Sequence, residues 1–467
     1  MWKVLPSLFL MLLILSGCSS DTKSDSSSVS EPNTNAIKQV EVQADGLLSN
    51  PDWSKDASIY EVNIRQYTPE GTFAAFAERL PELERLGVDI LWIMPVQPIG
   101  QKNRKGSLGS YYSIQDYTAI NPEYGSMADF KALVKQAHEL GFKVILDWVA
   151  NHTAWDHVWT ETHKDWYTLD AAGDFQAPVE DWSDVIDLNY GQPAMRNAMI
   201  EAMQFWIKEA DIDGFRCDVA NMVPLDFWES ARASLNELKP VFMLGEMSEP
   251  SYHSAFEMSY TWDLHHLFNE VAQGSKNAYD LRKQIQADED SFPSSAYRML
   301  FTSNHDENSW EGSAGERLGE AAESFAVMSY MLPGMPLIYS GQEAGLAKRL
   351  AFFEKDPINW SASRMRRVYQ VLNELKEKEP ALWQGPYAGG IEFVPTSNDA
   401  LMLVFIRKQA DSEVVALFNL SPAAQEVQMM GNEIEGMYTN AFTGQNVKMM
   451  PAVIQTFEPW GYGVLVK

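Results

Sequence analysis

An arginine and an aspartate lie two residues apart, at Arg216 and Asp218, within the short segment Asp213–Val219. Side chains two residues apart on a β-strand project from the same face, so both would point into whatever that strand lines. A guanidinium beside a carboxylate lowers the pKa of the carboxylate and holds it ionised, as a carboxylate nucleophile requires. A structural ion pair at the end of a strand is the alternative interpretation of this pair taken alone.

A second acid, Glu246, lies in the apolar run Met243–Met247, and a third, Asp306, follows another apolar run. Apolar neighbours would raise the pKa of Glu246 and keep it protonated near neutral pH, which suits a general acid. Two carboxylates beside the anomeric carbon of a sugar are the minimum for glycoside hydrolysis, because one attacks and the other protonates the leaving oxygen. The residues therefore predict Asp218 as the nucleophile and Glu246 as the acid.

These acids need a scaffold that brings them together. Apolar and β-branched runs predict strands at 58–64, 89–96, 143–149, 214–219, 241–247, 257–263, 299–304 and 336–340. Periodic stretches predict helices at 73–86, 127–140, 194–209, 227–238, 278–287, 316–331 and 365–378. The polar residues at the ends of the strands are Asp147, Asn151, His152, Arg216, Asp218, Glu246, His305 and Asp306.

Alternating strands and helices predict an α/β fold, a (β/α)₈ TIM barrel, in which functional residues gather at the carboxyl ends of the strands. An open doubly wound sheet is the alternative, but neither a Walker loop nor a G-x-G-x-x-G motif follows the first strand. Residues 151–188 are too long for a tight connection and predict a short insertion after strand 3. Short alternating runs after Gly385 predict a C-terminal antiparallel β domain.

We expect four parts along the chain. Residues 1–18 predict a signal peptide, in which Leu15–Cys18 resembles a bacterial lipoprotein signal and implies lipidation of Cys18; a plain secretory signal is the alternative. Residues 19–48 are rich in Ser, Asp, Thr and Asn and predict a flexible tether. The barrel would occupy 49–385 and a β-sandwich 386–467. Cys217 would then have no cysteine to pair with inside the mature chain.

Charge restricts the partners. The net charge is −28, from 36 Lys and Arg against 64 Asp and Glu. This balance disfavours nucleic acid and anionic membrane surfaces as partners and favours a neutral ligand. We expect membrane contact only through the N-terminal lipid, and a monomer.

Four short segments resemble the signature regions of the α-amylase family of glycoside hydrolases, in the family's order: Asp147–His152, Gly214–Asp218, Gly245–Glu246 and Ser303–Asp306. Two more stretches, 187–189 and 334–343, look like further segments of the same family. The resemblance is close over residues 57 to 360 and implies the family's barrel and C-terminal β domain.

The resemblance implies that Asp218 is the nucleophile and Glu246 the acid/base of a retaining mechanism, while Asp306 grips sugar hydroxyls and stabilises the transition state. It implies further roles around the sugar: Tyr112 stacks on it in subsite −1, Asp147 supports the site from the third strand, Arg216 orients Asp218, and His152 and His305 bind hydroxyls.

The chain departs from the family pattern just after the nucleophile. Many members carry a lysine and a histidine three and four residues beyond it, where this chain has Asn221 and Met222. The histidine's carbonyl binds calcium in those members. Asn151 resembles another family calcium ligand, so a structural calcium ion stays open, whereas the chemistry itself requires no cofactor.

These features together predict a hydrolase of α-1,4-glucosidic bonds in starch, glycogen or maltooligosaccharides, at the bacterial cell envelope on the periplasmic side or the cell surface. The alternatives are an α-glucan transglycosylase, a neopullulanase-like or cyclomaltodextrinase-like enzyme and, from another class, a non-catalytic glycan-binding barrel.

Overall fold

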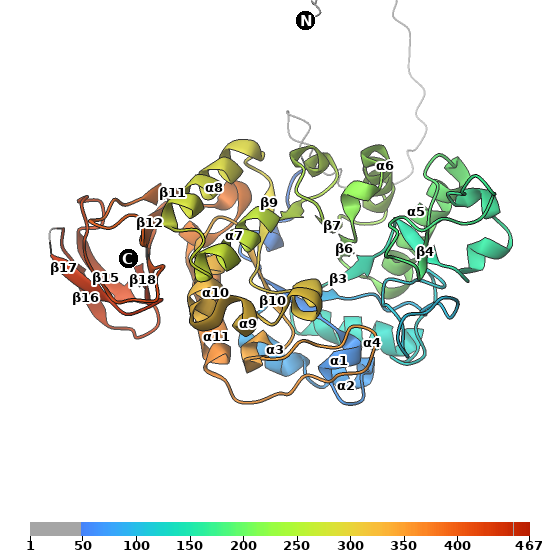
Figure 1. Cartoon of the computed structure of the whole chain (residues 1–467), viewed down its shortest axis with the longest axis horizontal. Helices are drawn as coiled ribbons and strands as arrows, with labels where there is room; N and C mark the ends of the chain where they lie inside the picture. Colours follow the sequence, from blue (N-terminus) through green and yellow to red (C-terminus); the bar gives the residue numbers. More distant parts are fainter. Residues whose placement is uncertain (1–47, 452) are drawn as a thin grey trace, which may run out of the picture. The chain divides into compact units, whose positions relative to one another are not determined.

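The computed structural model describes residues 48–451 and 453–467. Parallel strands close a barrel in the order β1-β10-β9-β8-β7-β6-β3-β2 (Figure 1). Their bounds are β1 (Ile59–Val62), β2 (Ile90–Ile93), β3 (Lys143–Trp148), β6 (Gly214–Cys217), β7 (Phe242–Gly245), β8 (Met258–Tyr260), β9 (Tyr297–Leu300) and β10 (Met335–Tyr339). The predicted TIM barrel is confirmed, and each of its strands overlaps a predicted one.

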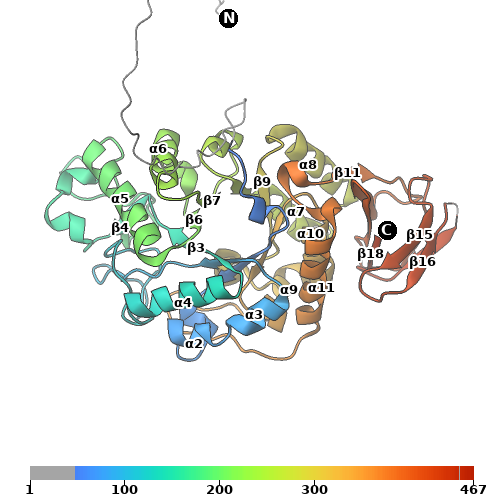
Figure 2. The same ribbon diagram turned by 180° about the vertical axis from the view of Figure 1, so that it is seen from behind.

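Helices cover the outside of the barrel. They are α1 (Ile64–Tyr67), α2 (Phe73–Ala77), α3 (Leu80–Leu86), α4 (Met127–Glu139), α5 (Pro193–Ala210), α6 (Leu225–Asn236), α7 (Trp262–Ala272), α8 (Ala278–Ser291), α9 (Ala314–Leu318), α10 (Ala322–Met331) and α11 (Arg364–Lys378). Neighbours pack pairwise, as α4 with α5, α5 with α6 and α3 with α11. Figure 2 shows α4, α3 and α11 along the outside of the strands.

Three helix predictions need correction. The stretch 73–86 is two helices, because Pro81 has no amide hydrogen to continue a helix and instead occupies the first turn of α3. The stretch 316–331 breaks at Gly319, whose φ of 55° lies in the left-handed region. Helix α7 was missed because the predicted strand 257–263 ends earlier, at Tyr260, and the helical spacing begins at once.

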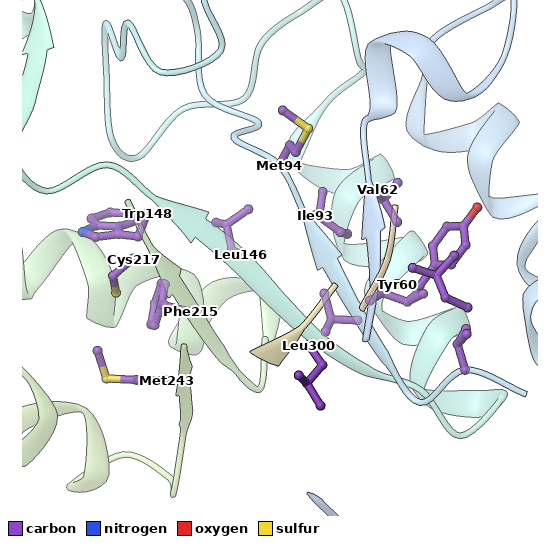
Figure 3. Packing of buried hydrophobic residues seen from close by; sticks show 14 of the residues in the cluster. Tyr60, Val62, Ile93, Met94, Leu146, Trp148, Phe215, Cys217, Met243 and Leu300 are labelled. Atoms are coloured by element: carbon purple, nitrogen blue, oxygen red, sulfur yellow. The ribbon is translucent and has the colours of Figure 1, made fainter. Parts of the chain in front are cut away.

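Two apolar layers follow the alternation of side chains along each strand. Ile59, Ile90 and Ile145 belong to a cluster drawn from barrel strands that fills the interior. Residues on the opposite face of these strands, among them Val62 and Leu146, belong to the larger cluster shared with the helices (Figure 3). Every second residue of a strand faces the barrel interior. At the carboxyl ends of β1, β3 and β6 these inward positions hold polar residues, which are Glu61, Asp147 and Arg216.

Gly214 allows strand β6 to lie close to β7. A Cβ atom at this position would lie 1.8 Å from the carbonyl oxygen of Phe242. No other residue fits there without moving β7, and β6 carries Arg216 and leads directly to Asp218. Gly214 therefore controls the spacing between the two strands that lead to Asp218 and Glu246.

The insertion and the C-terminal domain are confirmed. After β3 the chain makes an antiparallel pair, β4 (His152–Ala154) with β5 (Val185–Asp187). The C-terminal strands form a six-stranded sheet, β11-β12-β13-β18-β15-β16, and a separate β14-β17 pair. Their bounds are β11 (Gly390–Phe393), β12 (Met402–Gln409), β13 (Ser412–Asn419), β14 (Gln425–Gln428), β15 (Gly436–Asn440), β16 (Asn446–Met449), β17 (Ile454–Phe457) and β18 (Tyr462–Val466). One apolar cluster joins the sheet and the pair.

Candidate active site

One guanidinium at the barrel mouth contacts three carboxylates. Nη1 of Arg216 lies 2.9 Å from Oδ1 of Asp147 and 3.1 Å from Oδ1 of Asp218. Nη2 lies 2.8 Å from Oε2 of Glu246, and Nε donates to the Tyr260 hydroxyl at 3.1 Å. Since these acids come from β3 and the loops after β6 and β7, Arg216 joins three adjacent strand ends. Ion pairs of this kind are strong only when the remaining polar atoms are also satisfied.

Asp147 is satisfied by further donors behind the mouth. Its Oδ2 accepts from Nε1 of Trp92 and from the Tyr112 hydroxyl, each at 3.0 Å. Both Asp147 and Arg216 are fully buried beneath the residues that line the cavity. Their position fits the supporting and orienting roles that the resemblance implies, since a sugar in the cavity would meet the residues above them.

His305 connects the opposite side of the mouth to the same network. Its Nδ1 lies 2.6 Å from Oε1 of Glu61, and its Nε2 lies 2.8 Å from the Tyr112 hydroxyl and 3.2 Å from Oδ2 of Asp306. Burial by itself lowers the pKa of His305, but Asp306 and Glu61 outweigh burial and raise the pKa well above its ordinary value. Oxygen acceptors at both ring nitrogens favour the imidazolium form of His305.

The acids titrate differently from one another. Burial opposes ionisation of Asp306, yet His305 and Arg216 outweigh it and hold the pKa of Asp306 below its ordinary value. For Asp218, burial is the largest influence and raises the pKa; Arg216 acts against it, while the charge of Glu246 adds to it. The net pKa of Asp218 is raised, so the prediction of a lowered pKa is wrong: the guanidinium is shared among three acids in a buried site.

The predicted apolar surroundings of Glu246 are also wrong. Its Oε2 contacts Nη2 of Arg216 and accepts a hydrogen bond from the backbone N–H of Val219 at 2.8 Å. The backbone at Val219 has a φ of 36°, a left-handed conformation that is costly for a β-branched residue. This strained turn directs the amide next to Asp218 toward the second acid. The polar carboxylate environment was invisible in the apolar run of sequence around Glu246.

A cavity of about 370 Å³ opens over these groups. Six of the residues predicted for the site line it together: Tyr112, His152, Asp218, Glu246, His305 and Asp306. Lining residues that the sequence interpretation did not select come mainly from the surrounding loops: Lys105, Ser110, Trp182, Asp184, Val185, Val219, Trp310, Phe352 and Phe353. Their chemistry, aromatic faces beside acids and hydroxyl-binding groups, suits a sugar.

Trp310 is the most exposed aromatic ring at the cavity, with half of its surface open to solvent. It lies in the π-helical turn Glu307–Glu311 directly after Asp306, and its ring centroid is 5.1 Å from that of Phe352. A tryptophan four residues after a predicted catalytic acid was the signal available in the sequence. A half-exposed ring beside the cavity offers a stacking surface.

Beyond Asp218, Asn221 and Met222 lie in the 3₁₀ turn Ala220–Met222. The amide of Asn221 donates to Oε1 of Glu249 at 3.0 Å, and Met222 is 41% exposed. Neither side chain lines the cavity in the described part of the chain. The residues that depart from the family pattern therefore lie outside the mouth, on the side of β6 and β7.

Asn151 is the one calcium ligand that the resemblance implies, and its amide nitrogen lies 3.3 Å from Nδ1 of His152. Within residues 48–451 and 453–467, no group of three or more His, Cys, Asp or Glu side chains could hold one metal ion. The structural calcium ion that the resemblance leaves open stays a prediction.

His152 is expected to make the fold sensitive to mild acid. Burial lowers its pKa to about 4, from an ordinary 6.5. Because only the unfolded chain is protonated between these values, the stability that neutral His152 contributes is complete above pH 6.5 and is lost as pH falls toward 4. The loss reaches about 2 kcal/mol by pH 5. The melting temperature should thus fall more between pH 7 and pH 5 for the native chain than for His152→Gln; equal falls would contradict this.

Comparisons with known proteins agree with this geometry. The family model described as "Alpha amylase, catalytic domain" matches residues 23–184 and 179–401. The alpha-amylase MalA of Haloarcula japonica is 30% identical over 350 residues, which is 71% of this chain but only 50% of MalA. The chain thus spans about half the length of that relative.

Solved structures match over more of their length. The crystal structure of an alpha-amylase from Lactobacillus plantarum is 31% identical with a TM-score of 0.81, covering 89% of this chain and 99% of that one. A noncanonic maltogenic alpha-amylase, AmyB from Thermotoga neapolitana, is 27% identical with a TM-score of 0.79, covering 89% and 97%. The closed barrel, the acids that meet at its mouth and the match of the family model lead to one conclusion: this chain belongs to the alpha-amylase family of glycoside hydrolases.

Proposed function

We propose that the chain hydrolyses α-1,4-glucosidic bonds in starch, glycogen or maltooligosaccharides with retention of configuration. The observation that carries the proposal is the contact of Asp218 and Glu246 with adjacent nitrogens of one guanidinium, at 3.1 and 2.8 Å. Retaining enzymes hold their two carboxyl groups about 5–5.5 Å apart, and inverting enzymes about 6.5–9.5 Å apart. Acids that share a single Arg216 favour the shorter separation.

In the first step, Asp218 attacks the anomeric carbon as the bond to the glucosidic oxygen breaks, and Glu246 gives its proton to that oxygen. Positive charge that develops on the sugar favours the ionised form of Asp218, although burial raises its pKa in the empty site. Asp306, whose pKa is lowered, supplies a further fixed negative charge beside the sugar. The product is a sugar bound covalently to Asp218 and a free chain end.

In the second step, Glu246 takes a proton from water while the water oxygen attacks the anomeric carbon and releases Asp218. The Val219 amide holds the Glu246 carboxylate in place for both transfers. His305, His152 and Tyr112 line the cavity, where the resemblance implies that the two histidines bind sugar hydroxyls and Tyr112 stacks on the sugar. A transglycosylase or a neopullulanase-like enzyme would differ in the acceptor or the substrate and would use the same acids.

The anomeric form of the first products tests the proposal. The purified chain acting on maltoheptaose should release new reducing ends as the α-anomer. Proton NMR detects this anomer if spectra are taken before mutarotation equalises the two forms. Initial β-anomer would contradict retention. Products longer than the substrate would assign the enzyme to transglycosylation, and complete absence of new reducing ends would leave a glycan-binding barrel.

Attachment to an envelope membrane through lipid on Cys18 is also proposed, from the sequence alone, since Cys18 lies outside the described residues. Within those residues, no helix combines the length and the apolar character needed to cross a membrane. The support is the lipoprotein-like segment Leu15–Cys18 followed by a polar stretch suited to a tether.

A further inference from the structure

The loop that follows β2 is joined on one side to the insertion after β3. Nζ of Lys105 lies 3.2 Å from Oδ1 of Asp184 and donates to the carbonyl oxygen of Asp181 at 2.6 Å. The Asp184 side chain is only 8% exposed and the Lys105 side chain 32%, so the carboxylate is shielded while the lysine is partly open to water. Lys105 and Asp184 both line the active-site cavity. Their contact therefore closes the gap between two loops at the cavity wall.

The same loop is joined on its other side to the loop after β10. The Ser107 amide donates to Oε1 of Glu354 at 2.8 Å, and the Leu108 amide donates to the Phe353 carbonyl at 3.1 Å. Gly106 permits this approach: its φ is 62°, and a Cβ atom there would lie 2.5 Å from Cβ of Phe353. The loops after β10, β2 and β3 thus form one continuous wall, since β10, β1, β2 and β3 are consecutive in the barrel.

The catalytic acid lies away from this wall. Glu246 follows β7, and its contacts are with Arg216 and with Val219, which follows β6. On that side the chain presents the exposed turn at Asn221 and Met222, whose side chains do not reach the cavity within the described residues. Because Glu246 protonates the leaving oxygen, the leaving part of the glucan extends toward β6 and β7. The sugar that bonds to Asp218 therefore extends toward the wall.

We infer that this wall bounds the non-reducing side of the site, so that the enzyme seats the non-reducing end of an α-glucan and releases one short saccharide from it. The inference rests on the proposed glucan hydrolysis and adds which part of the chain is recognised. A cavity of about 370 Å³ has room for only a short stretch of sugar beside the wall. An internal segment of a long chain would need an opening between the loops that Lys105 and Glu354 hold together.

Two forms of one substrate test the inference. Maltoheptaose carrying a chromophore at its reducing end is supplied with the non-reducing end either free or blocked at O4 and O6. From the first time points, the free form should release a saccharide of a single length. The blocked form should be cleaved at least about tenfold more slowly, which corresponds to about 1.4 kcal/mol. Comparable rates on both forms with mixed early products would overturn the inference while leaving hydrolysis intact. No cleavage of either form would instead refute the proposed function.

Opening the wall gives an independent measurement. The double variant Lys105→Ala and Glu354→Ala removes the side-chain contacts on both sides of the loop and leaves only the backbone bond from Leu108 to Phe353. Its rate on the blocked substrate relative to the free one should rise at least about threefold, or about 0.6 kcal/mol. Lys102→Ala is the matched control, because Lys102 is exposed in the same loop and its Nζ lies over the Trp155 ring at 5.3 Å, away from the cavity lining. An unchanged ratio in a double variant that melts within a few degrees of the native chain would overturn the inference.

Discussion

Asp218→Asn is expected to lower kcat on maltoheptaose by on the order of 10⁴-fold or more, because an amide cannot form the covalent bond to the sugar. The same change should leave the melting temperature at pH 7 equal to or above that of the native chain. The folded pKa of Asp218 is raised, so its ionised form costs stability above the unfolded pKa, and a neutral amide removes that cost. A structural ion pair with Arg216 would give the opposite result, a clear loss of stability with activity retained.

Glu246→Gln extends this test to the second acid. Loss of general acid and base assistance should cost roughly 10²–10⁴-fold on maltoheptaose. A maltosyl fluoride needs no proton on its leaving group, so it should still form the covalent sugar on Asp218, and added azide should then accept the sugar with retained configuration. Asp165→Asn and Glu237→Gln are matched controls at exposed positions. Near-native turnover on maltoheptaose by either site variant would refute the proposed roles.

Arg216→Met is expected to have the largest effect on stability. The guanidinium is fully buried, and its loss leaves the acids at positions 147, 218 and 246 without their shared cation. Removing one partner of a buried ion pair typically costs about 3–5 kcal/mol, because the remaining charge is uncompensated. Urea unfolding at pH 7 measures this loss, and activity should fall with it because both acids lose their orientation.

Two comparisons make the Arg216 result specific. Arg216→Lys keeps the charge but cannot reach three acids with one planar group, so it should recover part of the stability and little of the activity. Arg79→Met removes an arginine that pairs with Glu82 at 2.8 Å on the surface, where a loss of about 0–1 kcal/mol is expected. A similarly small loss for Arg216→Met would show that the three contacts contribute little.

The barrel strands were predictable because their apolar runs are short, separated and rich in β-branched residues. Helix α7 was not, since Trp262 and Leu264 continue an apolar run that also fits a strand, and only the turn of chain after Tyr260 separates the two elements. The breaks at Pro81 and Gly319 had visible signals in residue type. The predicted boundaries were wrong where the same run of residues fits both the strand and the helix periodicity.

The site divides in the same way. The sequence alone predicted that Asp218, Glu246 and Asp306 would meet at one mouth, because each follows a barrel strand and strand ends gather there in this fold. It did not determine their charge states. Arg216 contacts three acids because of the spacing of the strands. The Val219 amide reaches Glu246 because of a strained turn. No single segment of the sequence encodes either arrangement.

The surroundings of the sugar were likewise decided by tertiary structure. Glu61 and Trp92 complete the network from strands whose sequences look like core, and the ion pair Lys105–Asp184 joins residues 79 positions apart. Such contacts depend on how loops from different strands lie over the mouth. The contacting residues have no regular separation in the sequence from which the contacts could be predicted. The sequence by itself thus determined the scaffold and the acids that meet at its mouth, whereas the pKa shifts of those acids and the wall of the cavity came from packing between distant segments.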